Sequence, residues 1–276
     1  MQQYISQHGH QLQLFIFISL FVVIWNVENI SGALINYKKW RHAFTNAHFI
    51  LTSIPGQLLL GFALIKTINW TSQQQFGLLY LLPTGTAPAY KFIASFVLLD
   101  LGEYAYHVIM HKVKRLWMIH VVHHSDRIVD VSTTLREHPA ENIVRLSFTL
   151  VWVFVTGTAF WMLMLRQVIQ AVATVFAHMN YRLPDKIDKV IGLVFITPNL
   201  HQVHHHYKQP FTDCNYGDVL SIWDRIFGTF RRLPSDKLVF GVDTYMGETE
   251  TTNFISLIKA PFRKYRSTKK DEERNA

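Results

Sequence analysis

The chain has 276 residues, a length that suits one domain with a sizeable core and is short for two. Hydrophobic residues make up 49% of the chain and charged residues only 17%, less than the roughly 25% of charged residues in soluble domains, which argues against an ordinary soluble protein. The formal net charge is +8, but the basic residues lie at the ends of apolar runs and in the C-terminal tail, as membrane orientation requires, so we expect no nucleic-acid partner.

Four long apolar runs predict membrane-spanning helices, each of which needs about 20 apolar residues. They cover residues 12–35, 48–68, 89–110 and 143–165, and the fourth is the longest without interruption. A shorter helix over 167–178 is expected to return from the fourth run. The first run has neither a basic start nor a small-residue cleavage site, so we expect a retained span rather than a signal peptide. The prediction is an all-α, integral-membrane helical bundle with four to five membrane helices.

Lys and Arg residues near the span ends set the expected orientation, because loops rich in these residues stay in the cytosol. Such residues follow the first and third runs, whereas residues 1–11 contain none. They are Lys38, Lys39, Arg41, Lys112, Lys114, Arg115 and Arg127. Two spans separate the two basic loops, so both lie on one side of the membrane. We expect that side, with the C-terminus, to face the cytosol.

The chain becomes more polar from residue 182 onward, with short helical patterns at 186–195 and 217–226. The end, 264–276, is charged and is expected to form a disordered tail. The single cysteine, Cys214, excludes an internal disulfide and a CxxC metal site.

Histidines gather in the middle of the chain: 11 of the 15 fall between His107 and His206. They form a pair in the stretch HVIMH, triplets in HVVHH and HQVHH, and a single His178 at the start of HMNYRLP. Residues at positions i, i+3 and i+4 of a helix share one face. Each triplet is therefore expected to present its imidazoles together, in a helical cap on the cytosolic side.

The number of these histidines indicates two metal ions rather than one. The pair and the triplets supply eight imidazoles on one membrane face, whereas a single ion takes roughly four to six ligands. Imidazole binds iron, zinc, copper or nickel, so the ligand type alone leaves the metal open. Without a metal, clustered imidazoles would repel one another when protonated, whereas metal binding requires their neutral form.

At these residues the sequence resembles the fatty acid hydroxylase and sterol desaturase superfamily of integral-membrane, non-haem di-iron enzymes. HVIMH, HVVHH and HQVHH are similar to the family's three histidine boxes in order and spacing, and the stretch HMN at 178–180 is similar to a further histidine between them. Asp100, ahead of the first box, and the segments 215–217 and 223–229 also fit the pattern. The resemblance covers residues 100–230, nearly half the chain.

The resemblance implies two iron ions bound by histidines, with zinc as a product of mismetallation. The implied ligands are His107, His111, His120, His123, His124, His178, His201, His204 and His205. The stretch REHP at 136–139 resembles one that many members carry, so His138 is either a ligand, a residue that supports a ligand, or a helix cap. His206 is expected to point about 100° away from its predecessor on a helix. The remaining histidines, expected at the interface or in packing contacts, are His8, His10, His42 and His48.

Metal-bound histidines usually donate their second ring N–H to a carboxylate or carbonyl group. Candidates for this supporting role are Asp100, Glu103, Asp126, Glu137, Asn199 and Asp218, for each of which a helix cap or a surface position is an open alternative. Glu103 lies one helical turn before His107. It is favoured with Asp100, because a carboxylate near the membrane end of a span needs a partner.

We therefore expect three segments within one structural domain. Residues 1–88 would form an N-terminal transmembrane hairpin and loop, residues 89–235 a catalytic domain of the histidine-box fatty acid hydroxylase type, and residues 236–276 a cytosolic segment and tail.

The implied function is the O2-dependent hydroxylation or desaturation of a membrane lipid with a long acyl chain or a sterol-like body, because unactivated C–H bonds resist acid–base chemistry. The lipid would enter sideways between apolar helices. The aromatic residues that either line its path or serve in ordinary packing are Phe92, Phe96, Trp117, Phe148, Trp152, Phe160 and Phe176. The chain shows no cytochrome b5-like segment and no GxGxxG motif. A separate electron-donor protein is therefore expected.

Two other functions are compatible with a histidine cluster. A zinc-dependent membrane hydrolase would need an open zinc position with a general-base glutamate, as in HExxH, a motif that does not occur here. A metal-ion transporter would need histidines through the membrane midplane, whereas these lie at span ends and in polar segments. Metal analysis separates these functions, since iron near two per chain favours the oxygenase.

Overall fold

The computed structural model describes residues 2–31, 37–244 and 247–264. The charged tail predicted for 264–276 therefore lies outside the described residues except for Lys264, as does the end of the first predicted span beyond residue 31.

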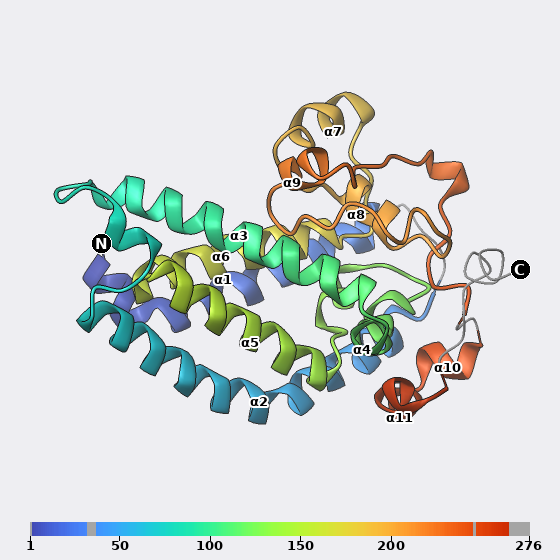
Figure 1. Cartoon of the computed structure of the whole chain (residues 1–276). Coiled ribbons are helices and arrows are strands. Elements are labelled where there is room, and N and C mark those ends of the chain that lie inside the picture. The colour runs from blue at the N-terminus through green and yellow to red at the C-terminus, as the bar shows by residue number, and fades with distance from the viewer. Residues whose placement is uncertain (1, 32–36, 245–246, 265–276) are drawn as a thin grey trace, which may run out of the picture.

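Five long helices run alongside one another and form a bundle (Figure 1). They are α1 (Gln2–Ser31), α2 (Lys39–Gln73), α3 (Pro88–Lys112), α5 (Pro139–Thr156) and α6 (Phe160–Ala177). The remaining elements are η1 (Leu78–Leu81), α4 (Lys114–His124), η2 (Val131–Leu135), α7 (Asp185–Ile191), α8 (Pro198–His204), α9 (Ile222–Ile226), η3 (Ser235–Lys237), α10 (Glu248–Thr252), α11 (Phe254–Ile258) and η4 (Ala260–Phe262). No strand occurs in the described residues, so the predicted all-α class is confirmed.

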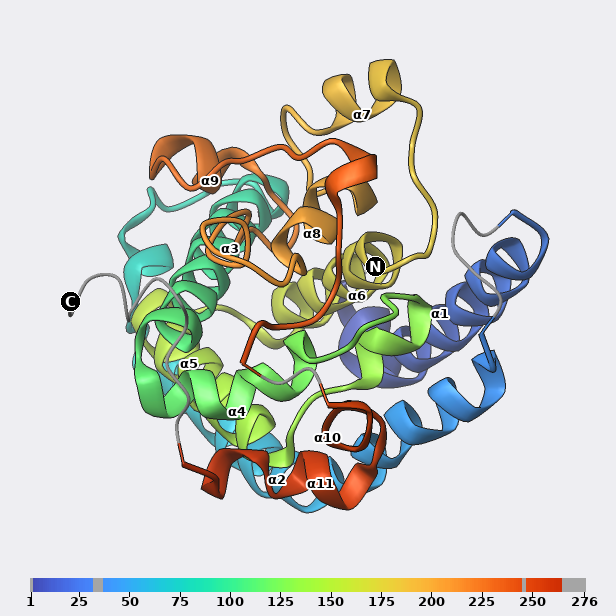
Figure 2. The ribbon, with the colours of Figure 1, turned by 90° about the vertical axis from the view of Figure 1, so that its right-hand side faces the viewer.

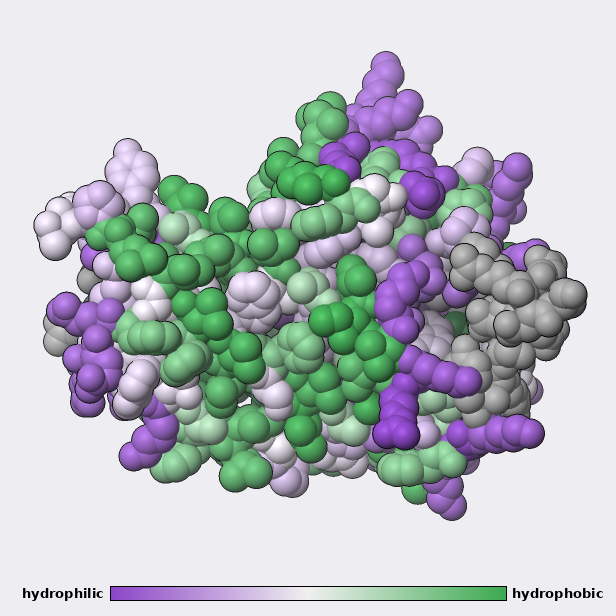
Figure 3. Space-filling model, viewed as in Figure 1, coloured by the Kyte–Doolittle hydropathy of each residue, from purple (hydrophilic) through white to green (hydrophobic). Residues whose placement is uncertain are grey.

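Four segments are long and apolar enough to cross a membrane, within α1, from α2 through η1, in α3 and in α6. On the face in view, hydrophobic side chains cover the middle of the bundle and hydrophilic ones gather toward its two ends, one of which is the end where α4 and α7 lie (Figure 3). The protein is thus a multi-pass membrane protein whose bundle carries a polar cap at one end.

The bundle is held together by apolar packing between helices that are distant in the sequence. Helix α1 packs against α6, α2 packs against α5, and α3 contacts both α5 and α6. The largest buried cluster contains Leu64, Leu99, Val153 and Leu163, contributed by α2, α3, α5 and α6. The first two long helices are therefore packed onto the helices that follow them.

The predicted span over 143–165 is wrong, because the chain reverses direction within it. Helix α5 ends at Gly157, which has a left-handed backbone (φ 70°), and α6 starts at Phe160. The predicted helix over 167–178 is the second half of α6. Both sides of the turn are apolar, since both helices belong to the bundle, so composition did not mark the break.

A close contact with a second glycine fixes this turn. A Cβ atom added to Gly77 would lie 2.4 Å from the backbone nitrogen of Gly157, and one added to Gly157 would lie 2.4 Å from the carbonyl oxygen of Phe76. The two backbones can approach this closely only because neither residue has a side chain.

Short helices and turns form the polar cap at the other end of the bundle, seen end-on in Figure 2. The patterns expected at 186–195 and 217–226 correspond to the shorter α7 and α9. Asp224 at α9 accepts hydrogen bonds from the backbone N–H groups of Tyr216 and Gly217 and from the hydroxyl of Thr229. These contacts fold the segment after α8 back on itself.

Candidate metal centre

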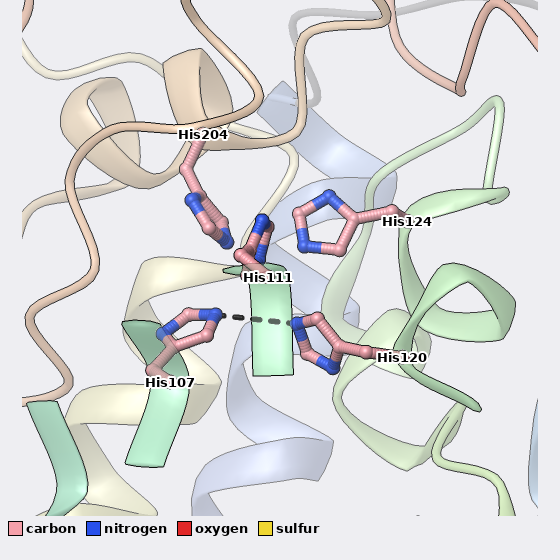
Figure 4. Close-up of side chains that lie close together, drawn as sticks. All are labelled: His107, His111, His120, His124 and His204. Atoms are coloured by element: carbon pink, nitrogen blue, oxygen red, sulfur yellow. Dashed lines mark hydrogen bonds between the residues drawn. The ribbon is translucent and has the colours of Figure 1, made fainter. Parts of the chain in front are cut away.

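Five histidines from three helices form the first group of candidate ligands. They are His107 and His111 on α3, His120 and His124 on α4, and His204 on α8, and one ring nitrogen from each lies within 4.8 Å of the others. Their rings face a common point (Figure 4). The pair on α3 and the pair on α4 are each spaced i, i+4, so each pair shares a helix face.

Four further histidines form a second group with the same spacing of ring nitrogens. His123 comes from α4, His178 caps the C-terminus of α6, and His201 and His205 come from α8 and its C-terminal cap. Helix α8 starts where the hydroxyl of Thr197 accepts the backbone N–H of Leu200. This cap fixes the short helix that, together with its C-terminal cap residue, carries three of the nine histidines.

Consecutive histidines of each triplet belong to different groups. His123 and His124 are neighbours on α4, and His204 and His205 are neighbours at the end of α8, yet each doublet is divided between the two groups. The ring of His124 lies 4.5 Å from that of His204 and 4.6 Å from that of His205, centroid to centroid. The two groups are thus adjacent, with α4 and α8 contributing to both.

Hydrogen bonds at Nδ1 orient six of these rings, one of them the ring of His111, whose Nδ1 lies 3.3 Å from a carboxylate oxygen of Asp213. Nδ1 of His107, His123, His178 and His204 lies 2.9, 3.2, 2.9 and 2.6 Å from the carbonyl oxygens of Tyr216, Arg136, Thr174 and Cys214, respectively. Nδ1 of His120 lies 2.6 Å from a carboxylate oxygen of Glu141. An oxygen acceptor requires the proton on Nδ1, so the lone pair of a neutral ring is on Nε2.

The Nε2 atoms, which carry these lone pairs, point at one another. Those of His107 and His120 are 3.2 Å apart, and those of His123 and His178 are 3.1 Å apart. A direct hydrogen bond within either pair would require one ring to be protonated on both nitrogens. A metal ion satisfies both lone pairs instead, so the donor set fits one metal per group.

Unpartnered ring nitrogens give independent support for metal binding. Among the described residues, neither nitrogen of His124 has a hydrogen-bond partner, and Nε2 of His111 and His204 have none either. Buried polar atoms normally find partners, so such a concentration of free acceptors calls for a ligand.

Burial keeps the rings outside the spans neutral. Desolvation, followed by neighbouring imidazoles, lowers the pKa well below the ordinary value for His123, His124, His201 and His205. Burial lowers the pKa of His178 to about 4 and that of His204 to about 3. These imidazoles are therefore unprotonated at neutral pH, the form that binds metals.

The six supporting residues predicted from the sequence have other partners in the structure. Asp100 accepts from the indole N–H of Trp223, Asn199 bonds the backbone of Leu183, and Asp126 pairs with His42. The other three acidic residues pair with arginines. The pairs are Glu103 with Arg145 and Arg166, Glu137 with Arg145, and Asp218 with Arg166. Most of these partners are distant in the sequence, although Arg145 follows Glu137 by only 8 positions, so position along the chain did not identify them.

Two carboxylates that the sequence prediction missed contact the first group. Glu141 accepts from His120, and a carboxylate oxygen of Asp213 lies 3.3 Å from Nδ1 of His111. Glu141 lies within the first turn of α5, one helical turn after Glu137. That spacing was the one available signal for it.

His138 and His206 lie apart from both groups. Nδ1 of His138 caps α5 by accepting the N–H of Ala140, and its Nε2 lies 3.1 Å from the carbonyl oxygen of Ile258. Nδ1 of His206 accepts the N–H of Val239. The helix-cap alternative for His138 is the one that the structure favours.

Comparison with known proteins finds one matching family model and several similar proteins. The family model described as "Fatty acid hydroxylase" matches residues 92–229. An alkylglycerol monooxygenase from Danio rerio is 31% identical over 59% of this chain and 35% of its own length, and one from Homo sapiens is 28% identical over 77% and 44%. An ornithine lipid hydroxylase from Rhizobium tropici is 27% identical over 53% and 43%. The chain thus spans less than half the length of these relatives. No solved structure matches it.

Proposed function

Because the chain belongs to the fatty acid hydroxylase family, we propose that it is a membrane oxygenase that hydroxylates a lipid with O2 and external electrons. The relatives named above are named for the oxidation of lipids, alkylglycerols in one case and ornithine lipids in the other. Membership of this family and a nitrogen-rich centre at the end of a membrane bundle together support the proposal that the enzyme acts on a C–H bond of a lipid.

The two histidine groups are the proposed ligands of two iron ions. The first ion would be held by His107, His111, His120, His124 and His204, and the second by His123, His178, His201 and His205. When bound, iron would supply the activation of O2 that side chains cannot perform, with one oxygen atom entering the C–H bond and the other leaving as water after the uptake of two electrons and two protons.

The chain's own residues orient the ligands and exclude water. Seven of the nine histidines are buried and two are partly buried. Glu141 holds the proton of His120 on Nδ1, which directs Nε2 toward the centre. Arg145 lies 3.7 Å from the same carboxylate and 2.7 Å from Glu137, and so balances their negative charge at the end of the bundle.

We propose that the lipid chain approaches between α3 and α5. A small cavity of about 10 Å³ lies there, lined by Gly102, Glu103, Phe148 and Trp152. A Cβ atom on Gly102 would lie 2.7 Å from the indole of Trp152, so glycine makes the room that this ring occupies. Movement of Trp152 would widen the cavity toward Glu103, which precedes His107 by one helical turn.

Electron donation and orientation follow from the same proposal. A separate donor protein would dock on the basic, histidine-bearing end, which we place with the C-terminus on the cytosolic side. Residues 89–235 would form the catalytic segment, and residues 1–88 would pack against it as a membrane hairpin.

The facing Nε2 atoms of His123 and His178, 3.1 Å apart, carry the proposal most directly. The test is comparative lipidomics of cells that express the wild-type chain or His204→Ala. A lipid that gains one oxygen only with the wild-type chain supports hydroxylation, and a loss of two hydrogens indicates desaturation. Hydrolysis products without added oxygen, together with zinc and no iron in the active purified protein, would overturn the proposal in favour of a zinc hydrolase.

A further inference from the structure

Two cavities share Arg41, near the start of α2. One has a volume of about 420 Å³ and is lined by polar residues of α2, α10 and the loop after α4. The other has a volume of about 840 Å³ and lies between α1 and α2. Arg41 lines both, so one ligand with a polar and an apolar part can occupy the two together.

The polar cavity carries an excess of positive charge. Lys38, Arg41 and Arg127 line it and are exposed, and within the described part of the chain none of them forms an ion pair. Three cations without a protein partner in one cavity favour an anionic ligand.

Two carboxylates and two further basic groups also line this cavity. Asp126 is already bound by His42, with 2.8 Å between the nearest atoms, and His42 also contacts Asp130. Arg136 is buried and donates to the carbonyl oxygens of Val122 and Thr251. Glu248 is the remaining carboxylate and is exposed. The charge of Asp126 is thus neutralised within the protein, and the cavity remains positive overall.

The second cavity is an apolar groove open to the side of the bundle. Aromatic rings from both helices line it, among them Phe21 and Trp25 of α1 and Trp40 and Phe44 of α2, and Ala47 leaves space along its length. Large apolar side chains around a groove of this volume are suited to an acyl chain.

The junction of the two cavities lies at the level expected for lipid head groups. The rings of Trp25 and Trp40 are 4.9 Å apart, and the ammonium group of Lys39 lies 4.3 Å from the centre of the Trp25 ring. Trp and Lys residues concentrate at membrane–water interfaces, with lysine reaching toward the aqueous side. Arg41, half a turn further along α2, is therefore placed where lipid phosphates lie.

We propose that these cavities form a binding site for an anionic phospholipid of the surrounding membrane. Its phosphate head group would contact Lys38, Arg41 and Arg127, and one acyl chain would lie in the groove between α1 and α2. This site is separate from the histidine centre and does not depend on the proposed reaction. Leu135 also lines the groove and precedes Arg136, whose carbonyl oxygen orients His123, so the bound lipid would support the loop beside the metal centre.

Native mass spectrometry of the purified full chain tests the proposal, with dioleoyl phosphatidylglycerol and dioleoyl phosphatidylcholine as matched anionic and zwitterionic probes. We expect the wild-type chain to bind the anionic lipid more tightly. Arg41→Gln and Arg127→Gln should each weaken its binding by about fivefold, the contribution of one interfacial cation, without changing the binding of the zwitterionic lipid. Ala47→Trp, which fills the groove, should weaken both lipids alike.

Arg115→Gln is the matched control, because Arg115 is an exposed arginine on α4 that does not line either cavity. It should bind both lipids as the wild-type chain does. Equal affinity of the wild-type chain for the two lipids would overturn the proposal, as would an Arg115→Gln effect equal to that of Arg41→Gln or unchanged binding in Ala47→Trp. Thermal melting of each variant distinguishes a lost site from a misfolded chain.

Discussion

Glu141 and His120 form the closest carboxylate contact of the candidate metal centre, with 2.6 Å between the carboxylate oxygen and Nδ1. Both side chains are buried, and the hydroxyl of Tyr106 donates a second hydrogen bond to the same oxygen. A carboxylate in this position fixes the tautomer of the ring and raises its basicity toward a metal.

We expect Glu141→Gln to lower metal affinity by about 10- to 100-fold, because an amide is a weaker acceptor than a carboxylate for the Nδ1 proton. The measurement is the iron retained by purified protein in competition with a chelator. Asp100→Asn is the control, since Asp100 bonds Trp223 and not a histidine. Equal iron retention in Glu141→Gln and the wild-type chain would contradict this role.

Removing one ligand from either group should by itself lower the iron content. We expect His204→Ala, in the first group, and His123→Ala, in the second, each to abolish lipid oxidation and to lower the iron content, while membrane insertion stays intact because no apolar span is changed. His206→Ala is a matched control from the same stretch that lies outside both groups. Full activity in either ligand variant would be incompatible with a centre of two metals.

The sequence predicted that the nine histidines lie close together, but it did not predict how they are divided between the two groups. Helical spacing predicted that each triplet shares a face, and the structure sends its i, i+4 members to one group and the remaining member to the other. His120 and His124 serve the first group, whereas His123 serves the second. That division depends on how α4 and α8 are placed against α3 and α6, which no local pattern encodes.

The supporting partners were the least predictable part of the site. Five of the six Nδ1 acceptors come from other segments of the chain, such as the carbonyl of Tyr216, which is 109 positions from His107. A backbone carbonyl has no sequence signature. Glu103, chosen for its position one turn before His107, bonds arginines instead, because the bundle brings Arg145 and Arg166 to it.

The turn between α5 and α6 offers a test of the fold. Gly157→Ala should destabilise the protein by about 1–2 kcal/mol for the left-handed backbone alone, and by more because the new Cβ would lie 2.4 Å from the carbonyl oxygen of Phe76. Gly228 has a similar backbone (φ 73°) but no atom within 4 Å of an added Cβ, so Gly228→Ala isolates the backbone effect. Thermal denaturation in detergent measures both, and equal shifts would contradict the close packing of this turn.

The buried histidines predict that the metal-free protein is sensitive to acid. The folded-state pKa is lowered to about 4 for His178 and to about 3 for His204, whereas histidine in an unfolded chain has a pKa of about 6.5. Below that value the unfolded chain binds protons that the folded chain does not, so the free energy of unfolding falls as the pH falls. Each such histidine contributes about 1.4 kcal/mol per pH unit in this range.

Buried carboxyl groups act in the opposite direction, since burial also raises the pKa of Glu137 and of Asp224. Burial raises the pKa of Asp218 to about 7, so the folded chain binds a proton there that the unfolded chain lacks, which stabilises the fold as the pH falls. Protonation of Asp218 offsets the effect of one histidine on the free energy of unfolding. Desolvation lowers the pKa of four further histidines, His123, His124, His201 and His205. The melting temperature of chelator-treated protein should therefore fall between pH 7 and pH 5, and less steeply in His178→Gln, which carries one fewer such group. A melting temperature that is constant or rises over this range would show that the imidazoles are not held neutral by burial.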